Sequence, residues 1–243
     1  DGMAVNDAQV TVGSAAASAA AESEDKTVDV AVDVSGIVVL ANTDTDNPDK
    51  EMIDAEVDKQ YAEDYPGVEA EVTSVTVTDG STLQLGTEKT GDTVTQGQVS
   101  NDIALESGAT LRTQNGDYTV GDDEGGAGVS GDGAVEATEN GRLTVKGDVT
   151  AQSGVSASGA ADSTNSTKVT VQGSIGSEET PVDSVAAQGS NATVETTGGI
   201  DTKSLSAASG GTVSADGNIT ATESAEVGDN GKIVSTGGTI TLA

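Results

Sequence analysis

The chain has 243 residues and a formal net charge of -31 at pH 7, with 41 acidic and 10 basic residues. This balance argues against nucleic-acid binding, because no basic stripe is available to replace the counterions of a phosphate backbone. Histidine and cysteine are absent, which removes a histidine base, a thiolate nucleophile and most transition-metal ligands. Phenylalanine and tryptophan are absent as well, so any core must be thin and built from valine, isoleucine and alanine.

The first clear pattern in the chain lies between residues 28 and 40. Residues 28–34 alternate valine with aspartate or alanine, which predicts a strand with one buried and one solvent-facing side. Gly36 interrupts this pattern. The apolar run at 37–40 then predicts a second, fully buried strand.

A helix is predicted next, over residues 47–65. Asn47 can cap its start, Pro48 can open it, and Pro66 follows its expected end. Four apolar or aromatic side chains then lie near one face, namely Met52, Ile53, Val57 and Tyr61.

The segment before this helix is the best candidate for a metal site. Asp44, Asp46 and Asp49 place oxygen ligands in one short loop, and hard oxygen ligands suit calcium. The loop departs from an EF-hand, because Pro48 occupies the fifth position and the glycine and bidentate glutamate are missing. The same residues are also well explained by a loop that caps the following helix. A second acidic group, at residues 122–124, lies in a glycine-rich stretch.

One nine-residue phrase returns five times in the second half of the chain. It reads apolar-x-x-x-Gly-x-(Val/Ile), and its copies begin at Leu143, Val169, Val194, Val213 and Val234. Its glycines are Gly147, Gly173, Gly198, Gly217 and Gly238, and its second apolar residues are Val149, Ile175, Ile200, Ile219 and Ile240. A further short strand fits between the copies, at residues 155–157, 185–187, 205–207 and 225–227. This loose period is typical of solenoid coils.

Turn pairs precede many of the predicted strands. They are Asp79-Gly80, Ser107-Gly108, Asn140-Gly141, Ser209-Gly210 and Asn230-Gly231. Glycine and asparagine tolerate the positive φ of tight corners. A single coil cannot bury its inner face, whereas stacked coils pair their backbones and align like residues in an apolar column. The pattern therefore favours stacked coils over residues 72–243 after an N-terminal part at 1–71, with a β-sandwich or meander as the alternative.

The phrases GGTVSADGNIT, NGRLTVKGDVT and NGKIVSTGGTITL resemble the repeats of bacterial surface β-helix proteins, such as autotransporter passengers and filamentous haemagglutinin-like adhesins. The resemblance covers residues 72–243 and implies a right-handed parallel β-helix, secretion, and a role in adhesion or display. It also implies that the helix at 47–65 covers an end of the coil stack. A helical insertion on the side of one coil is the alternative.

These observations predict a non-enzymatic, extracellular protein of a bacterial cell surface that acts as an adhesin or stalk and contacts host or microbial glycans or proteins. The alternatives are a carbohydrate-binding or pectin-lyase-like β-helix module and a disordered acidic spacer. No cofactor is expected, apart from the calcium hypothesis at Asp44, Asp46 and Asp49. Membrane insertion is not expected, because no apolar run approaches the length of a membrane span. The chain is expected to be part of a larger surface protein.

Overall fold

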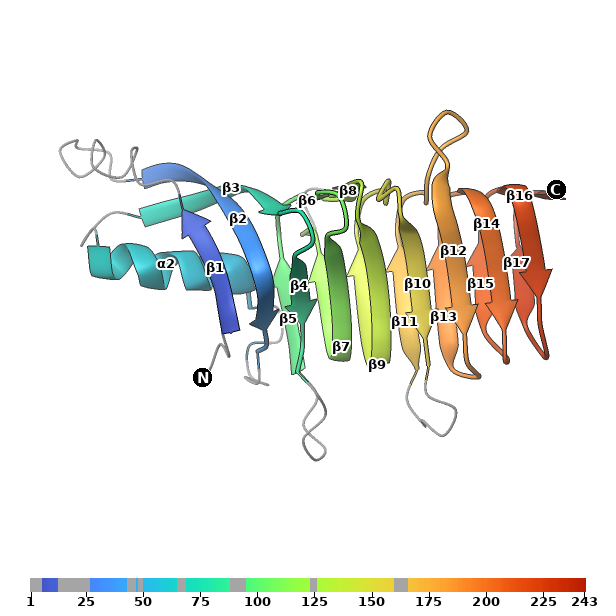
Figure 1. The fold of residues 1–243 in the computed structure, drawn as a ribbon, viewed down its shortest axis with the longest axis horizontal. Helices are drawn as coiled ribbons and strands as arrows, with labels where there is room; N and C mark the ends of the chain where they lie inside the picture. The colour runs from blue at the N-terminus through green and yellow to red at the C-terminus, as the bar shows by residue number, and fades with distance from the viewer. Residues whose placement is uncertain are drawn as a thin grey trace.

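The computed structural model describes residues 6–12, 27–42, 47, 50–64, 69–87, 95–122, 126–159 and 166–243. Within these residues the strands form one 18-stranded sheet that winds along the long axis of the molecule (Figure 1). The pairings from β2 onward are parallel, and β1 pairs antiparallel with β2. The fold is therefore all-β and a parallel β-helix, which confirms the prediction from the repeated phrase.

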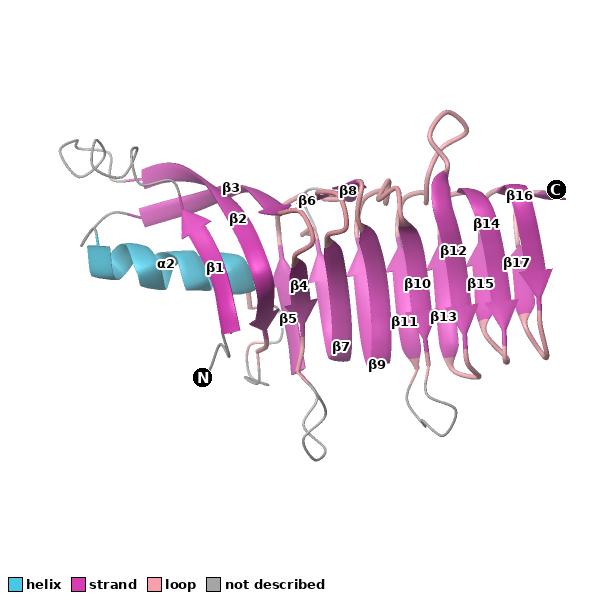
Figure 2. Ribbon diagram, viewed as in Figure 1, coloured by secondary structure: helices cyan, strands magenta, loops and turns pink. Residues whose placement is uncertain are grey.

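One helix accompanies the strands in the described residues (Figure 2). The strands are β1 (Asn6–Val12), β2 (Thr27–Leu40), β3 (Glu69–Val77), β4 (Thr82–Leu85), β5 (Thr95–Val99), β6 (Ile103–Leu105), β7 (Thr110–Val120), β8 (Val129–Gly131), β9 (Ala134–Val145), β10 (Gly154–Ser158), β11 (Thr167–Val171), β12 (Val182–Gln188), β13 (Ala192–Thr196), β14 (Ile200–Ala208), β15 (Thr212–Ala215), β16 (Ile219–Val227), β17 (Lys232–Ser235) and β18 (Ile240–Leu242). The helix is α2 (Met52–Asp64).

Each coil contributes one segment to each of three stacks of parallel strands, and one apolar column runs down the inside of every stack. The first column is Val32, Val75, Ile103, Val129, Val149, Ile175, Ile200, Ile219 and Ile240. The second column is Val38, Leu83, Leu111, Val135, Val155, Val185, Leu205 and Ala225. The third column includes Tyr118, Leu143, Val169, Val194, Val213 and Ile233. Except at the C-terminal end, these side chains are almost fully buried.

The predicted phrase corresponds to the corner between the third and the first stack. Four of its five copies lie in the predicted register, because Leu143, Val169, Val194 and Val213 stack directly on one another. The fifth assignment is wrong by one residue. Val213 pairs with Ile233, and Val234 faces outward and is 39% exposed. The last coil has one more residue between Ile233 and Ile240 than the earlier copies, which shifts its apolar residue relative to its glycine.

The glycines of the phrase stack as closely as the apolar residues do. The backbone N–H of Gly198 donates to the carbonyl of Gly173 at 2.9 Å, and that of Gly217 donates to the carbonyl of Gly198 at 2.8 Å. A Cβ atom on Gly173 would lie 2.8 Å from the Gly147 carbonyl oxygen. Glycine recurs here because any side chain would collide with the coil before it.

The N-terminal strands agree with their predictions in part. The valines of residues 28–34 are buried and the residues between them are exposed, so this strand has one solvent-exposed face, as predicted. Residues 37–40 are not fully buried, because Ile37 is 58% exposed and only Val38 and Leu40 point inward. The segment belongs to the second stack, where an outer face remains in solvent.

Helix α2 lies at the N-terminal end of the stacked coils (Figure 1). Met52, Ile53 and Val57 are buried, as their predicted common face requires, and the helix packs against β3 and β5. It starts at Met52, later than the predicted start at Asn47. The carboxylate of Glu51 accepts a hydrogen bond from the backbone of Ile53 at 3.2 Å and so occupies the capping position expected of Asn47.

Candidate functional site

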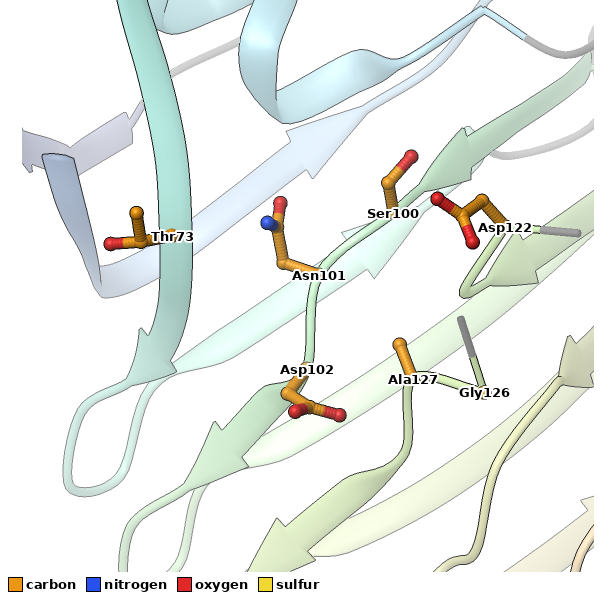
Figure 3. Close-up of a pocket in the computed structure, with 7 residues that line it drawn as sticks. All are labelled: Thr73, Ser100, Asn101, Asp102, Asp122, Gly126 and Ala127. Atoms are coloured by element: carbon orange, nitrogen blue, oxygen red, sulfur yellow. The ribbon is translucent and has the colours of Figure 1, made fainter. Parts of the chain in front are cut away.

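A polar pocket of about 340 Å³ opens on the side of the coil stack, next to the corner between the third and the first stack. Figure 3 shows its lining, which comes from β3, from the connection between β5 and β6, and from the connection between β7 and β8. The lining residues are Thr73, Ser100, Asn101, Asp102, Asp122, Gly126 and Ala127. Two carboxylates, one amide and two hydroxyls therefore meet around one hollow.

Asn101 is the most constrained of these side chains. Its Nδ2 donates to the carbonyl of Val72 at 2.7 Å, which orients the amide. Its Oδ1 is buried and has no hydrogen-bond partner among the described residues. A buried acceptor without a partner costs free energy, so the Asn101 amide is a locally unfavourable feature of the pocket wall.

Ser100 links the pocket to the start of α2. Its backbone N–H and its Oγ both donate to Oε2 of Glu51, each at 2.7 Å. Burial of Glu51 raises the pKa of its carboxyl, and the hydrogen bonds from Ser100 counteract part of that rise. Glu51 thus ties the helix to the wall of the pocket, and its own oxygens are already used.

Asp102 is also partly engaged, because its Oδ1 accepts a hydrogen bond of 2.7 Å from the backbone N–H of Gly128 in the next coil. The same contact recurs at later corners. Oδ1 of Asp148 accepts from the N–H of Ser174 at 2.7 Å, and Oδ1 of Asn218 accepts from that of Thr239 at 3.0 Å. These side chains occupy the variable position just before the Val/Ile of the phrase. Asp102 therefore stabilises the corner as well as lining the pocket.

The structure does not test the predicted calcium site. Asp44, Asp46 and Asp49 lie outside the described residues, and so do residues 123–125 of the second acidic group. Asp122, the one described member of that group, lines the pocket near Ser100 (Figure 3). In the part of the chain that is described, no group of three or more acidic side chains is arranged to hold a metal ion.

Nothing in the sequence predicted a functional role for Thr73, Ser100, Asn101 or Asp102. The run Ser-Asn-Asp at 100–102 looks like an ordinary turn, and nothing in it marks the approach of Thr73 from β3. Only the acidic group at 122–124 carried a signal, and the structure brings its first member to the pocket. The pocket is assembled from three separate segments, at residues 73, 100–102 and 122–127, which sequence spacing alone does not reveal.

The outer faces of the coils carry ion pairs between neighbouring coils. Arg112 contacts Glu136 at 2.9 Å, and Arg142 contacts Asp117. Lys168 contacts Glu195 and Lys203 contacts Asp183, each at 2.5 Å. These pairs use four of the ten basic residues, and most of the acidic residues whose burial the structure describes are exposed, so the described surface repels anionic partners.

No family model, curated protein or solved structure matches this chain. Among the described residues, no helix combines the length and the apolar character that a membrane span requires.

Proposed function

We propose that the chain is a non-enzymatic segment of an extracellular protein on a bacterial cell surface, where it acts as an adhesin or as a stalk that displays a binding surface. The observation that carries the proposal is the uninterrupted first column from Val32 to Ile240, in which each coil adds about 4.8 Å of length. A rod built in this way provides reach and rigidity. Its acidic outer surface favours solubility and opposes side-by-side aggregation.

The partner would be a glycan or protein of a host or microbial surface, and not nucleic acid or a membrane. The polar pocket is the place where such a partner would be held most specifically. The carboxylates of Asp102 and Asp122 belong to its lining and can accept hydrogen bonds from hydroxyl or amide donors.

A carbohydrate-active module of the pectin-lyase-like kind is the second candidate, and the pocket's two carboxylates favour it. The described residues that line the pocket include no arginine or lysine, and Lys146 packs next to the lining, against Gly121. The two arginines of the chain are instead paired with Glu136 and Asp117. The two arginines are thus engaged elsewhere, which favours a binding site over an arginine-dependent lyase site.

The test is binding of the purified chain to a panel of glycans and surface proteins, with calcium and again with a chelator. We expect either saturable binding that Asp122→Asn weakens or, for a pure stalk, no binding. Asp216→Asn is the matched control, because Asp216 is an exposed acid on a distant coil. Release of unsaturated products from a pectate-type polysaccharide by the wild-type chain would contradict the proposal.

A further inference from the structure

Most side-chain donors in the lining of the polar pocket are already used inside the protein. The hydroxyl of Thr73 donates to a backbone carbonyl of β2 at 3.1 Å, and the hydroxyl of Ser100 donates to Glu51 at 2.7 Å. The amide of Asn101 uses one of its two N–H groups on a backbone carbonyl of β3 at 2.7 Å. A ligand in this pocket must therefore bring donors of its own.

The acceptors that remain in the lining are negatively charged. Asp102 is exposed, and while its Oδ1 accepts from Gly128, no residue that the structure describes donates to its Oδ2. Asp122 brings a second carboxylate from the connection between β7 and β8 (Figure 3). Lys146 packs next to the lining, against Gly121, but is not part of it. The described lining itself thus carries only negative charge.

The charge of the whole chain acts in the same direction. A net charge of -31 attracts cations and repels anions, within a Debye length of about 8 Å at physiological ionic strength. An ammonium group combines a positive charge with three N–H donors and has no acceptor. It is therefore complementary to the pocket both in charge and in hydrogen bonding.

We propose that the pocket binds the free ammonium group of an amino sugar, so that the chain recognises glycans with unacetylated glucosamine-type residues. This rests on the proposed function, in which the pocket holds a glycan, and narrows it to one class. The pocket volume of about 340 Å³ lies within the range of about 300–1,000 Å³ that is usual for small-molecule sites. A lysine of a protein partner fits less well, because the described lining offers no large apolar side chain to seat the buried anchors of a protein interface.

The test is isothermal titration calorimetry of the 243-residue chain with a β-1,4-linked glucosamine tetramer, beside the same tetramer in fully N-acetylated form. Acetylation removes the positive charge and most of the N–H donors but leaves the sugar rings unchanged. We expect one saturable site for the glucosamine tetramer, with an affinity that falls as salt rises. The acetylated tetramer should bind at least about tenfold more weakly.

Variants separate the pocket from the overall charge. Asp102→Asn and Asp122→Asn should each weaken binding of the glucosamine tetramer by about tenfold or more. Asp102→Asn should still fold, because Asn218 makes the same corner bond with an amide oxygen. Asp216→Asn removes an exposed acid from a distant coil and should bind like the wild-type chain. Lys146→Gln removes a cation beside the lining and should bind at least as tightly.

Each other outcome has a distinct meaning. Equal losses in Asp102→Asn and Asp216→Asn would show that net charge alone attracts the amine, which overturns the proposal. Equal affinity for both tetramers, weakened by Asp122→Asn, would overturn the amine preference and still support a glycan site. A lysine-containing tetrapeptide that binds where the glucosamine tetramer does not would overturn the choice of a glycan. Failure of both tetramers to bind would overturn the proposal and leave the stalk form of the proposed function.

Discussion

The Oδ1 atom of Asp148 accepts a hydrogen bond of 2.7 Å from the backbone N–H of Ser174, the residue at the same corner of the next coil. The carbonyl of Ser174 in turn accepts from the N–H of Val149 at 2.9 Å. The two corners are thus joined by one side-chain and one backbone hydrogen bond. The side-chain bond supplies a partner for an N–H that the parallel ladder leaves open at the turn.

Replacing Asp148 with alanine should therefore destabilise the chain by about 1 kcal/mol, the usual net value of one hydrogen bond. Urea unfolding followed by circular dichroism measures the change. The exposed Asp132 of the same region provides the control, since Asp132→Ala removes the same charge. Equal stability of the two variants would show that the corner bond contributes nothing.

Gly154 tests the tightness of the corners. Its φ is 115°, and a Cβ atom there would lie 2.1 Å from the carbonyl oxygen of Ser184 in the next coil. Gly154→Val should cost at least about 2 kcal/mol, because it combines a strained φ with a collision. Gly80 has a φ of 65° and no atom within 4 Å of the same position, so Gly80→Val should cost less. A larger loss for Gly80→Val than for Gly154→Val would contradict this account of the corners.

Tyr118 fills the third column and its hydroxyl donates to Oγ1 of Thr95 inside the core. Burial raises the pKa of Tyr118 to about 12. Because this value exceeds the ordinary tyrosine value of 10.0, the neutral phenol contributes stability below pH 10 that is lost as pH rises through about 12. Titration of tyrosinate absorbance should show one late step that disappears in Tyr118→Phe. A late step that persists in that variant would assign it to another tyrosine.

Asp54 on α2 should make the stability of the chain depend on pH. Burial raises the pKa of Asp54, and the nearby carboxylates of Asp58 and Glu71 add to that rise. A raised carboxyl pKa means that the folded state binds the proton more tightly than the unfolded state does. The penalty from this group is therefore present at pH 7 and is relieved as pH falls through the folded pKa toward the ordinary aspartate value of 3.8.

The variant Asp54→Asn should consequently stabilise the chain at pH 7 by roughly 0.2–0.5 kcal/mol, the scale of a like-charge pair one helical turn apart. The gain should shrink as pH falls toward 4, when measured by urea unfolding at several pH values. Asp58 can be replaced in parallel as Asp58→Asn to separate the two charges. A gain that grows in acid would contradict the assigned direction.

The fold was predictable from the sequence because every coil of a solenoid needs apolar residues at the same inward positions. The same inward position recurs in every coil, so the repeat identified its residues from sequence alone. They include Val149, Ile175, Ile200 and Ile219. The error at Val234 has a local cause, since one extra residue in the last coil is invisible to an alignment on glycine. The helix begins at Met52 and not at Asn47, because Glu51 provides the cap. Ser100 of a later coil holds Glu51 in place.

The pocket was not predictable in the same way. Its residues follow no period, and Thr73, Asn101 and Asp122 meet only because three successive coils place them at one corner. The antiparallel β1 was not predicted either, because its seven residues carry no sign of the strand that they join. A feature that occurs once in a repeat protein depends on contacts between coils and leaves no recurring pattern. A feature that every coil shares appears as a repeat in the sequence.

The central claim is that single apolar columns hold the coils together, and Val213 tests it most directly. Val213 is 0% exposed and stacks between Val194 and Ile233, whereas Asp216 is exposed at the following corner. Thermal melting of Val213→Asp beside Asp216→Ala is the measurement. We predict that Val213→Asp loses at least about 3 kcal/mol, because it places an unpaired charge in the column, and that Asp216→Ala melts close to the wild-type chain. An unchanged melting temperature for Val213→Asp would contradict the account.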